Sequence, residues 1–330
     1  MNDRIIQIGS AQASPGEVGE GAIEITKHAG GNILSIPITI INGKNDGPCF
    51  WINGGIHGDE PEGILTCSMV RQAITPSILS GSVILAPVMN VPAMEAAERG
   101  NPLDTFSYDM NRIYPGKENG YLSERIANEH RKWLIKTADI EISIHSGGSH
   151  SYLSETIFAT KDSQAQELAR AMGEEWDLTL YANRPSGSPM AILTEIGKAA
   201  ITVELGGRSS TAPGAFHRVG EVLSRAALNI MKHYKMIEGE PTYPNKRYKG
   251  FQQALLAPES GVFLPETNIK FHQIMKKNDL IAKIINYKGK SIAELLAPED
   301  GMIFGLRALP NVTTGDWCCF YAIIEGTWDD

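Results

Sequence analysis

The stretch PCFWINGGIHGDEPEG, residues 48–63, joins a run of apolar residues to the start of a helical pattern. Its first part, PCFWIN, has the length and apolar character of a buried β-strand, and residues 62–74 follow with the spacing of an α-helix. The glycines between the two parts permit a sharp turn, and Pro61 suits the first turn of a helix. The stretch therefore predicts a strand that passes through a tight turn directly into a helix.

The alternation of strands and helices continues on both sides of this stretch. The apolar runs of strand length are residues 33–41, 48–53, 82–90, 139–145 and 200–205, and the helical patterns lie at 62–74, 122–137, 163–176 and 217–235. Several of the runs are too continuous for a sheet with one face in water. We therefore predict an α/β domain over residues 1–240, with a mostly parallel or mixed sheet flanked by helices. In such sheets ligands bind beyond the carboxyl ends of the strands.

The pattern of the chain changes after Tyr234. Residues 236–250 are polar and rich in proline, glycine and charge, as expected of a connector between domains. Beyond them, the segment LLAPE at residues 255–259 recurs at 295–299, and short strands alternate with turn residues. This internal repeat predicts a small, pseudo-symmetric β-barrel or sandwich over residues 250–330.

This second unit resembles the barrel-sandwich of lipoyl and biotinyl carrier domains, in which Ala-Pro-x-x-Gly and KNDLIA-type segments recur. Carrier domains present a modifiable lysine on a hairpin between their two halves, and Lys288 occupies the corresponding place in the sequence. The small or apolar neighbours that such a lysine usually has are missing here. Ordinary turn chemistry therefore favours the interpretation of Lys288 as an exposed residue of a hairpin.

The composition excludes several classes of protein. The 330 residues are 42% hydrophobic and 21% charged, which is typical of a globular protein. The 30 Lys and Arg against 38 Asp and Glu give a formal charge of −8, so neither nucleic acid nor an anionic membrane is an expected partner. No run approaches the roughly 18 apolar residues of a spanning helix, and the first residues do not resemble a signal peptide. We therefore expect a cytoplasmic protein with reduced thiols, and a homodimer is the default oligomer.

Two residues of the turn are candidate metal ligands. His57 and Glu60 are three residues apart and can direct a nitrogen and an oxygen at one point, where zinc would accept them at about 2.0–2.2 Å. Asp59 and Glu62 are competing carboxylates, because helix amino termini attract acidic residues, but the spacing favours Glu60. His145, which ends an apolar run and precedes Ser-Gly-Gly, is the best third candidate. Two histidines and one glutamate leave the fourth position of a single zinc ion open, as in catalytic zinc sites.

Glu204 is the candidate general base. It follows the apolar run AITV and precedes Leu-Gly-Gly, so its neighbours are expected to be buried and a carboxylate there needs a reason. Zinc lowers the pKa of its bound water from about 15.7 to about 7. A nearby carboxylate can take the proton during attack on a carbonyl group and return it to a leaving amine.

Taken in order, these motifs resemble those of the succinylglutamate desuccinylase and aspartoacylase family, which is related to the zinc carboxypeptidases. The matching segments are GGIHGDE around His57, DMNR at residues 109–112 followed by YPG, SIHS around His145, and ELG at Glu204. They span roughly residues 50–207, and the trailing β unit also resembles the C-terminal domain of the family. The resemblance implies a carboxypeptidase-like mixed sheet flanked by helices and followed by that β unit.

The resemblance also implies roles for single residues. The three candidate ligands and the candidate base correspond to the zinc ligands and the general base of the family. Asn111 and Arg112 match the pair that holds the substrate carboxylate, a task that suits the planar guanidinium group. Arg99 precedes that pair, as a second arginine of the family does, and would polarise the scissile carbonyl.

Two departures from the family concern specificity. Ser143 stands two residues before His145, where many family deacylases have aspartate, and Glu204 is followed by LGGR instead of the VGP of aspartoacylase. The acyl group is therefore not carried over from the family. We expect a zinc-dependent deacylase that hydrolyses the amide bond of a small N-acyl amino acid or a related carboxylated amine. The alternatives are a metallocarboxypeptidase that acts on peptide C-termini and a non-catalytic carboxylate-binding relative.

Several residues near the motifs allow two interpretations. Arg208 is either a substrate contact or a surface charge, and Tyr114 either lines the pocket or packs beneath its loop. Tyr287 and Tyr321 of the second unit are candidates to reach over the site, as an acyl-oxygen donor does in related enzymes. His150 has no ligand partner nearby in the sequence, so we interpret it as a loop histidine.

Overall fold

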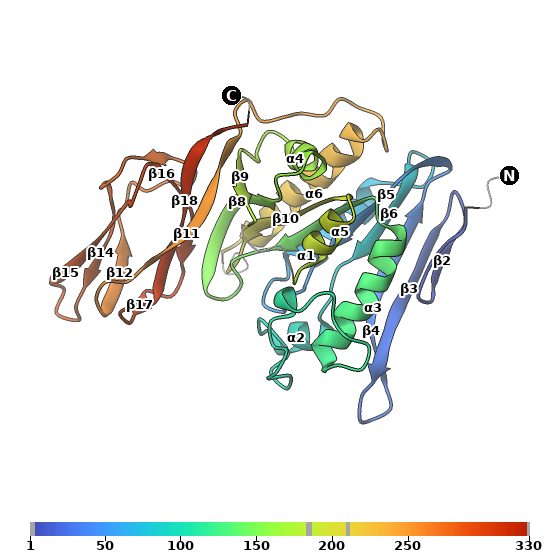
Figure 1. Ribbon diagram of the computed structural model, residues 1–330, viewed down its shortest axis with the longest axis horizontal. Helices are drawn as coiled ribbons and strands as arrows, with labels where there is room; N and C mark the ends of the chain where they lie inside the picture. Colours follow the sequence, from blue (N-terminus) through green and yellow to red (C-terminus); the bar gives the residue numbers. More distant parts are fainter. Residues whose placement is uncertain (1–3, 183–186, 209–211, 329–330) are drawn as a thin grey trace.

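The strands form one long mixed sheet that runs through the molecule. The computed structural model describes residues 4–182, 187–208 and 212–328. Within these residues, a sheet of 12 strands has the order β13-β16-β18-β11-β9-β8-β10-β7-β5-β6-β4-β3 (Figure 1). The bounds are β3 Val18–Lys27, β4 Ile33–Asn42, β5 Asn45–Asn53, β6 Ser80–Ala86, β7 Ile140–His145, β8 Ser151–Ala159, β9 Leu178–Tyr181, β10 Ala199–Gly206, β11 Tyr248–Leu256, β13 Ile274–Met275, β16 Gly301–Arg307 and β18 Trp317–Thr327. A separate hairpin of β1 (Ile6–Ile8) and β2 (Ala11–Ala13) lies near the amino terminus.

Three central strands place their carboxyl ends at one edge of this sheet. β5 pairs in parallel with β6 and with β7, and β7 pairs in parallel with β10. The strands β4 and β8 are added antiparallel to this group, so the sheet is mixed, as predicted. In the register of β7 and β10, Glu204 lies opposite His145. The turn after β5, the end of β7 and the end of β10 therefore meet at one place.

Helices cover both faces of the central sheet (Figure 1). Their bounds are α1 Glu62–Ala73, α2 Val91–Ala96, α3 Leu122–Thr137, α4 Ser163–Arg170, α5 Pro189–Glu195 and α6 Ala215–His233, with a 3₁₀ turn, η1, at Met110–Arg112. Alternate residues of β5 point into two apolar cores: Phe50 and Ile52 pack with α1, α4 and α6, whereas Trp51 packs with α3 and α5. None of the helices described is long and apolar enough to cross a lipid bilayer.

The predicted elements agree with the structure over the central sheet and differ at its ends. The helix predicted at 163–176 ends at Arg170, shortly before Gly173, which has a left-handed φ of 107°. The strands β3, β8 and β9 were not among the predicted apolar runs. β8 is not an apolar run because it carries polar side chains, such as Ser154 and Thr156, which are nevertheless buried.

The second unit consists of two packed β layers. One is a four-stranded sheet of β15 (Ser291–Leu296), β14 (Leu280–Ile285), β12 (Gly261–Pro265) and β17 (Asn311–Val312), and the other consists of β13, β16, β18 and β11. A separate apolar core that includes Phe263, Ile281 and Tyr321 fills the space between them. The sequence repeat is also structural, because each LLAPE segment ends one strand and turns into the next, from β11 to β12 and from β15 to β16.

The two units share hydrogen-bonded strands. β11 pairs with β9 in parallel, and β16 pairs with β8 antiparallel. The strands β8, β9, β11, β18 and β16 thereby close into a ring, whose interior holds Leu153, Leu178, Leu180, Met302, Phe304 and Ala322. The connector predicted at 236–250 already ends inside β11. The division into residues 1–240 and 250–330 stays a prediction, and the second unit is joined to the first by a continuous sheet.

A Ser–His–Asp group ties the ring together on its outer side. His272 places Nδ1 2.5 Å from Asp177 Oδ1 and Nε2 2.9 Å from Ser154 Oγ. The Ser154 hydroxyl donates a hydrogen bond of 3.0 Å to the carbonyl oxygen of Phe304. Ser154 is buried and none of the three lines the cavities described below. The three residues are hydrogen-bonded in the same sequence as the members of a catalytic triad. Their position indicates a structural role instead, because they connect the second unit to β8 and to the residue before β9.

Candidate active site

The turn after β5 brings His57 and Glu60 to the edge of the sheet. A Cβ atom on Gly58 would lie 2.0 Å from the backbone of Ala93, so a residue with a side chain does not fit there. Gly55 has a left-handed φ of 59°, which glycine adopts without strain. Pro61 directly precedes α1, and the loop is thus fixed between a buried strand and a buried helix.

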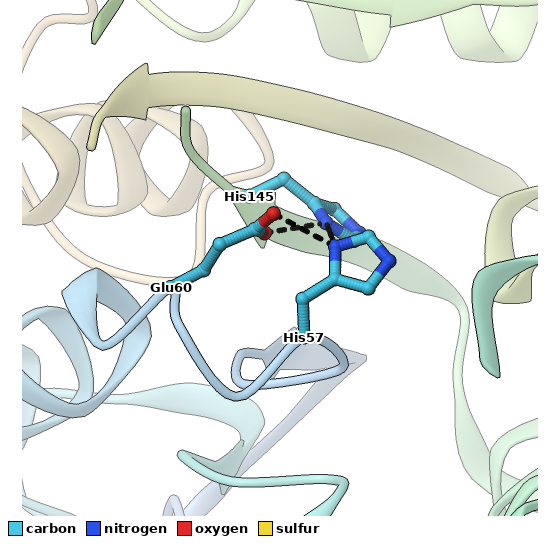
Figure 2. A group of neighbouring side chains, drawn as sticks. All are labelled: His57, Glu60 and His145. Carbon is cyan, nitrogen blue, oxygen red and sulfur yellow. Dashed lines mark hydrogen bonds and ion pairs between the residues drawn. The ribbon is translucent and has the colours of Figure 1, made fainter. Parts of the chain in front are cut away.

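His57, Glu60 and His145 form a compact cluster (Figure 2). One ligand atom from each lies within 4.8 Å of the others, and all three side chains are buried. Nδ1 of His57 is 2.8 Å from Glu60 Oε1, and Nδ1 of His145 is 2.9 Å from Glu60 Oε2. Figure 2 shows the Glu60 carboxylate facing both imidazole rings from one side. The three predicted ligands, of which His57 and His145 are 88 residues apart in the sequence, thus point toward one place.

The donor set fits zinc. The Nδ1 atoms of His57 and His145 lie 3.2 Å apart, and nitrogens that share one tetrahedral zinc at 2.0–2.1 Å lie about 3.3–3.4 Å apart. Nε2 of His57 donates a hydrogen bond of 3.1 Å to Asp109 Oδ1, which leaves Nδ1 of that ring free to act as an acceptor. Two buried imidazole acceptors and a carboxylate facing one another favour a cation between them.

The two competing carboxylates of the turn have other partners. Asp59 Oδ2 accepts hydrogen bonds from the backbone and the hydroxyl of Ser149. Glu62 is buried and accepts one hydrogen bond from the Ser146 hydroxyl, at 2.9 Å, and one from the Gly207 amide, at 2.8 Å. Ser146 follows His145, and Gly207 lies three residues after Glu204. Glu62 therefore ties the end of β7 to the end of β10.

Asp109 is a site residue to which the sequence analysis gave no role. Its carboxylate contacts His57 and also accepts three further hydrogen bonds. They come from Arg99 Nε at 3.2 Å, from Arg99 Nη2 at 3.0 Å and from the backbone N–H of Asn111 at 3.0 Å. Burial opposes its ionisation, but the hydrogen bond from His57 and the charge of Arg99 together lower the pKa of Asp109. The DMNR motif signals its presence, whereas its contact with His57 depends on the folded loop.

The remaining predicted site residues lie in the same cavity as the cluster. This cavity has a volume of about 510 Å³, and Arg99, Asn111, Arg112 and Glu204 line it together with the three ligands. Arg99 Nη1 is 3.7 Å from Glu60 Oε1, and Asn111 Nδ2 is 3.4 Å from His145 Nε2. The structure therefore brings all seven predicted side chains into one hollow.

Glu204 faces the cluster from β10. Its Oε2 atom is buried and has no hydrogen-bond partner among the residues that the structure describes. Burial raises the pKa of Glu204 well above its ordinary value, and the negative charge of Glu60 adds to this shift. A carboxyl group whose pKa is raised toward the pH at which the enzyme works is suited to accepting and returning a proton.

A second cavity opens from the first. It has a volume of about 580 Å³, and the residues that line both cavities and mark their junction are Asn111, Arg112, Phe158, Glu204, Gln252 and Phe320. The side chains that line only the second cavity include Tyr181, Ser188, Met190, Thr202 and Ala254. Strands of the second unit contribute Gln252, Phe304, Trp317 and Phe320 to the first cavity. No motif in the sequence marks these four residues.

The residues with two interpretations can now be placed. Tyr114 is buried and its hydroxyl lies 2.9 Å from Nδ1 of His130, so it packs beneath the loop. Tyr321 is buried and donates a hydrogen bond to the carbonyl oxygen of Glu299, and Tyr287 is exposed, and neither lines a cavity described above. Arg208 donates a hydrogen bond to the Ser149 carbonyl at the rim. His150, interpreted as a loop histidine, does line the first cavity.

Comparison with known proteins places the chain in a family. A model of the succinylglutamate desuccinylase/aspartoacylase catalytic domain matches residues 46–233. The chain belongs to this family, whose members hydrolyse amides. The matched residues contain the sheet edge and all seven predicted site residues, whereas the second unit lies outside the match.

Relatives of known name or structure cover nearly the whole chain. An N-alpha-acetyl-L-2,4-diaminobutyric acid deacetylase from Halomonas elongata is 26% identical over 86% of this chain and 84% of its own length. The crystal structure of a succinylglutamate desuccinylase/aspartoacylase from Rhodobacter sphaeroides has a TM-score of 0.78 at 24% identity and covers 94% of this chain and 95% of its own. A succinylglutamate desuccinylase from a Silicibacter species has a TM-score of 0.82 at 22% identity, with 98% and 100% covered. These solved structures share the fold, including the second unit.

Proposed function

We propose that this chain is a zinc-dependent deacylase that hydrolyses the amide bond of a small N-acyl amino acid. The observation that carries the proposal is the buried His57, Glu60 and His145 cluster, which shares a cavity with Glu204 and Arg112. Family membership supports amide hydrolysis, and the relative from Halomonas elongata, named as a deacetylase of an acylated amino acid, supports the substrate class.

The substrate carboxylate would lie at the junction of the two cavities. Arg112 offers a planar pair of donors there, and Asn111 adds an amide group beside it. Arg99, held by Asp109 and near Glu60, is placed to donate to the acyl oxygen. These three residues would bind and orient the amide so that its carbonyl carbon faces the three-residue cluster.

Glu204 would move the proton. Zinc held by His57, Glu60 and His145 would act as a Lewis acid that polarises the acyl carbonyl and lowers the pKa of a water molecule. Glu204 accepts a proton from the attacking water, whose oxygen ends on the acyl carbon, and returns the proton to the nitrogen when the C–N bond breaks. The products are a carboxylic acid and a free amino acid.

A deacylation screen with a matched variant tests the proposal. Zinc-loaded protein is assayed against acetyl, succinyl and longer acyl derivatives of several amino acids, with tripeptides as the test of carboxypeptidase activity. We expect hydrolysis of acyl amino acids, and a fall in kcat of about 10²–10⁴ for Glu204→Gln at unchanged zinc content. Near-normal turnover by Glu204→Gln would remove Glu204 from the mechanism. Cleavage of tripeptides alone would support a carboxypeptidase instead.

A further inference from the structure

An aromatic wall closes one side of the first cavity. Four rings stand in series along it: Phe158 packs edge-on against Phe304 at 6.3 Å, Phe304 stacks with Phe320 at 5.9 Å, and Phe320 stacks with Trp317 at 4.7 Å. Leu153 and Phe304 belong to the packed core inside the ring of strands, with 5% and 1% of their surface exposed, so Phe158, Phe320 and Trp317 form the more exposed part of the wall. Three of the four rings come from the second unit, and the proposed chemistry uses none of them. A contiguous apolar surface inside a polar active site calls for an apolar ligand group.

The fold is shaped to present these rings. A register shift between Leu255 and Leu256 leaves Cys318 as an extra residue in β18, so Trp317 and Phe320 can stack despite being three residues apart. Gly305 lies opposite Phe320 on β16. A Cβ atom on Gly305 would lie 2.3 Å from Leu153 Cδ2 and 3.1 Å from the Phe320 ring. The rings therefore occupy space that a larger residue at position 305 would remove.

The position of the wall identifies the part of the substrate that meets it. Arg112 and Glu204 line both cavities, whereas the three ligands line only the first. An amide whose carboxylate lies at Arg112 and whose carbonyl faces the ligands has its amino-acid part at the junction. Its acyl chain then extends into the rest of the first cavity. Trp317 lines only that cavity, whereas Phe158 and Phe320 line both, so an acyl chain in the first cavity meets the wall at Trp317 and Phe320.

The polar part of the lining of the first cavity disfavours an acidic acyl group. Asp59 and Glu98 line this cavity, together with Tyr108, Ser149 and His150. Two described arginines line the cavity: Arg99 is held by Asp109, and Arg112 is assigned to the carboxylate of the amino acid. The terminal carboxylate of a succinyl group would therefore share the cavity with the carboxylates of Asp59 and Glu98 and with aromatic rings. Both surroundings penalise a negative charge.

We infer that the acyl group of the substrate is neutral, apolar and longer than acetyl, and that it packs on the stacked rings of Trp317 and Phe320. The inference rests on the proposed deacylase function and adds the acyl class to it. A cavity of about 510 Å³ has room for such a chain. Each added methylene that is buried on the wall should raise kcat/KM about three- to fourfold until the wall is covered.

An acyl series on one amino acid tests the inference with the unmodified protein. The zinc-loaded protein is assayed with the N-acetyl, N-butanoyl, N-hexanoyl and N-succinyl forms of a single amino acid. We expect kcat/KM to rise at least tenfold from acetyl to hexanoyl, and succinyl to fall at least tenfold below butanoyl. Equal or better hydrolysis of the acetyl or succinyl form overturns the inference and leaves the deacylase function intact. No hydrolysis of any form overturns both.

Variants of the wall test whether the preference for long acyl chains depends on Trp317 and Phe320. Phe320→Leu and Trp317→Leu keep an apolar side chain but remove the stacked rings, and Tyr287→Leu removes an exposed ring of the same unit as a matched control. We expect the two wall variants to lower kcat/KM for the hexanoyl form about tenfold and for the acetyl form less than twofold, with no change in Tyr287→Leu. Equal losses for both substrates in folded wall variants would contradict the assignment.

Discussion

The edge of the central sheet and the aromatic wall line the same cavity, but only the edge can be recognised from short motifs in the sequence. At the edge, His57, His145 and Glu204 lie where parallel strands end, and each is followed within two residues by glycine. The wall residues Trp317 and Phe320 belong to the first part of β18, where no short motif marks them. Local motifs mark the residues of the edge, whereas the wall forms only when strands that are distant in the sequence pair with one another.

This contrast separates chemistry from selection among substrates. The edge and the loops beside it carry every charged group that the proposed reaction uses, and hydrogen bonds through Asp109 and Glu62 join them. The wall contributes surface without charge. Changes at the edge should therefore lower the turnover of every substrate, and changes at the wall should alter the order in which substrates are preferred.

The strongest test at the edge outside the ligands and the base is Asp109→Asn. The amide keeps the size of the side chain but removes the negative charge that holds His57 and Arg99. Loss of such a partner of a metal ligand costs about 10–100-fold in metal affinity or activity. We expect that loss for acetyl and longer acyl substrates alike, measured by zinc titration and by kcat/KM.

Asp104→Asn is the matched control for that variant. Asp104 is a buried carboxylate in the same region of the chain. It accepts hydrogen bonds from the Ser107 hydroxyl and the Ser123 backbone amide, each at 2.7 Å, and lies outside both cavities. Its variant should keep zinc affinity and turnover. A similar loss in both variants would mean that the loop, and not the contact with His57, is responsible.

A smaller effect is expected from Glu62, which aligns two strand ends without facing the cavity. Glu62→Ala removes the acceptor of the Ser146 and Gly207 hydrogen bonds, so His145 and Glu204 lose a common support. We expect kcat to fall about tenfold with KM nearly unchanged, since small displacements of catalytic groups act on the chemical step. Glu62→Gln keeps an acceptor for Gly207 and should restore most of kcat. A change in KM alone would contradict a positioning role.

The sheet edge could be predicted because short, local sequence patterns mark it. The strands β5, β7 and β10 are continuous apolar runs, and the polar residues that end them stand out against that background. Because parallel strands end at the same edge, their order in the sheet was enough to bring His145 and Glu204 together. Asp109 was visible as part of DMNR, but its reach to His57 depends on two loops that no periodicity describes.

The wall required information that the sequence carries weakly. β8 has buried polar residues and did not resemble an apolar run, so its pairing with β16 was not foreseen. Without that pairing, the C-terminal repeat predicts a separate unit, and nothing places Trp317 beside the ligands. The extra residue Cys318, which lets Trp317 and Phe320 stack, follows from the register of two strands and not from composition.

The smallest effect on turnover is expected where the second unit is fastened to the sheet. His272 has a left-handed φ of 59°, which asparagine tolerates, so His272→Asn removes the ties to Asp177 and Ser154 with little backbone strain. We expect the free energy of unfolding to fall by about 1–3 kcal/mol in denaturant titrations, and the turnover of the acetyl substrate to stay within twofold.

Ser154→Ala tests whether the Ser–His–Asp group has a structural or a catalytic role. Because the Ser154 hydroxyl is buried against Phe304 outside the cavities, its removal should leave hydrolysis intact, whereas abolished turnover in a folded Ser154→Ala protein would move the chemistry from the sheet edge to this group.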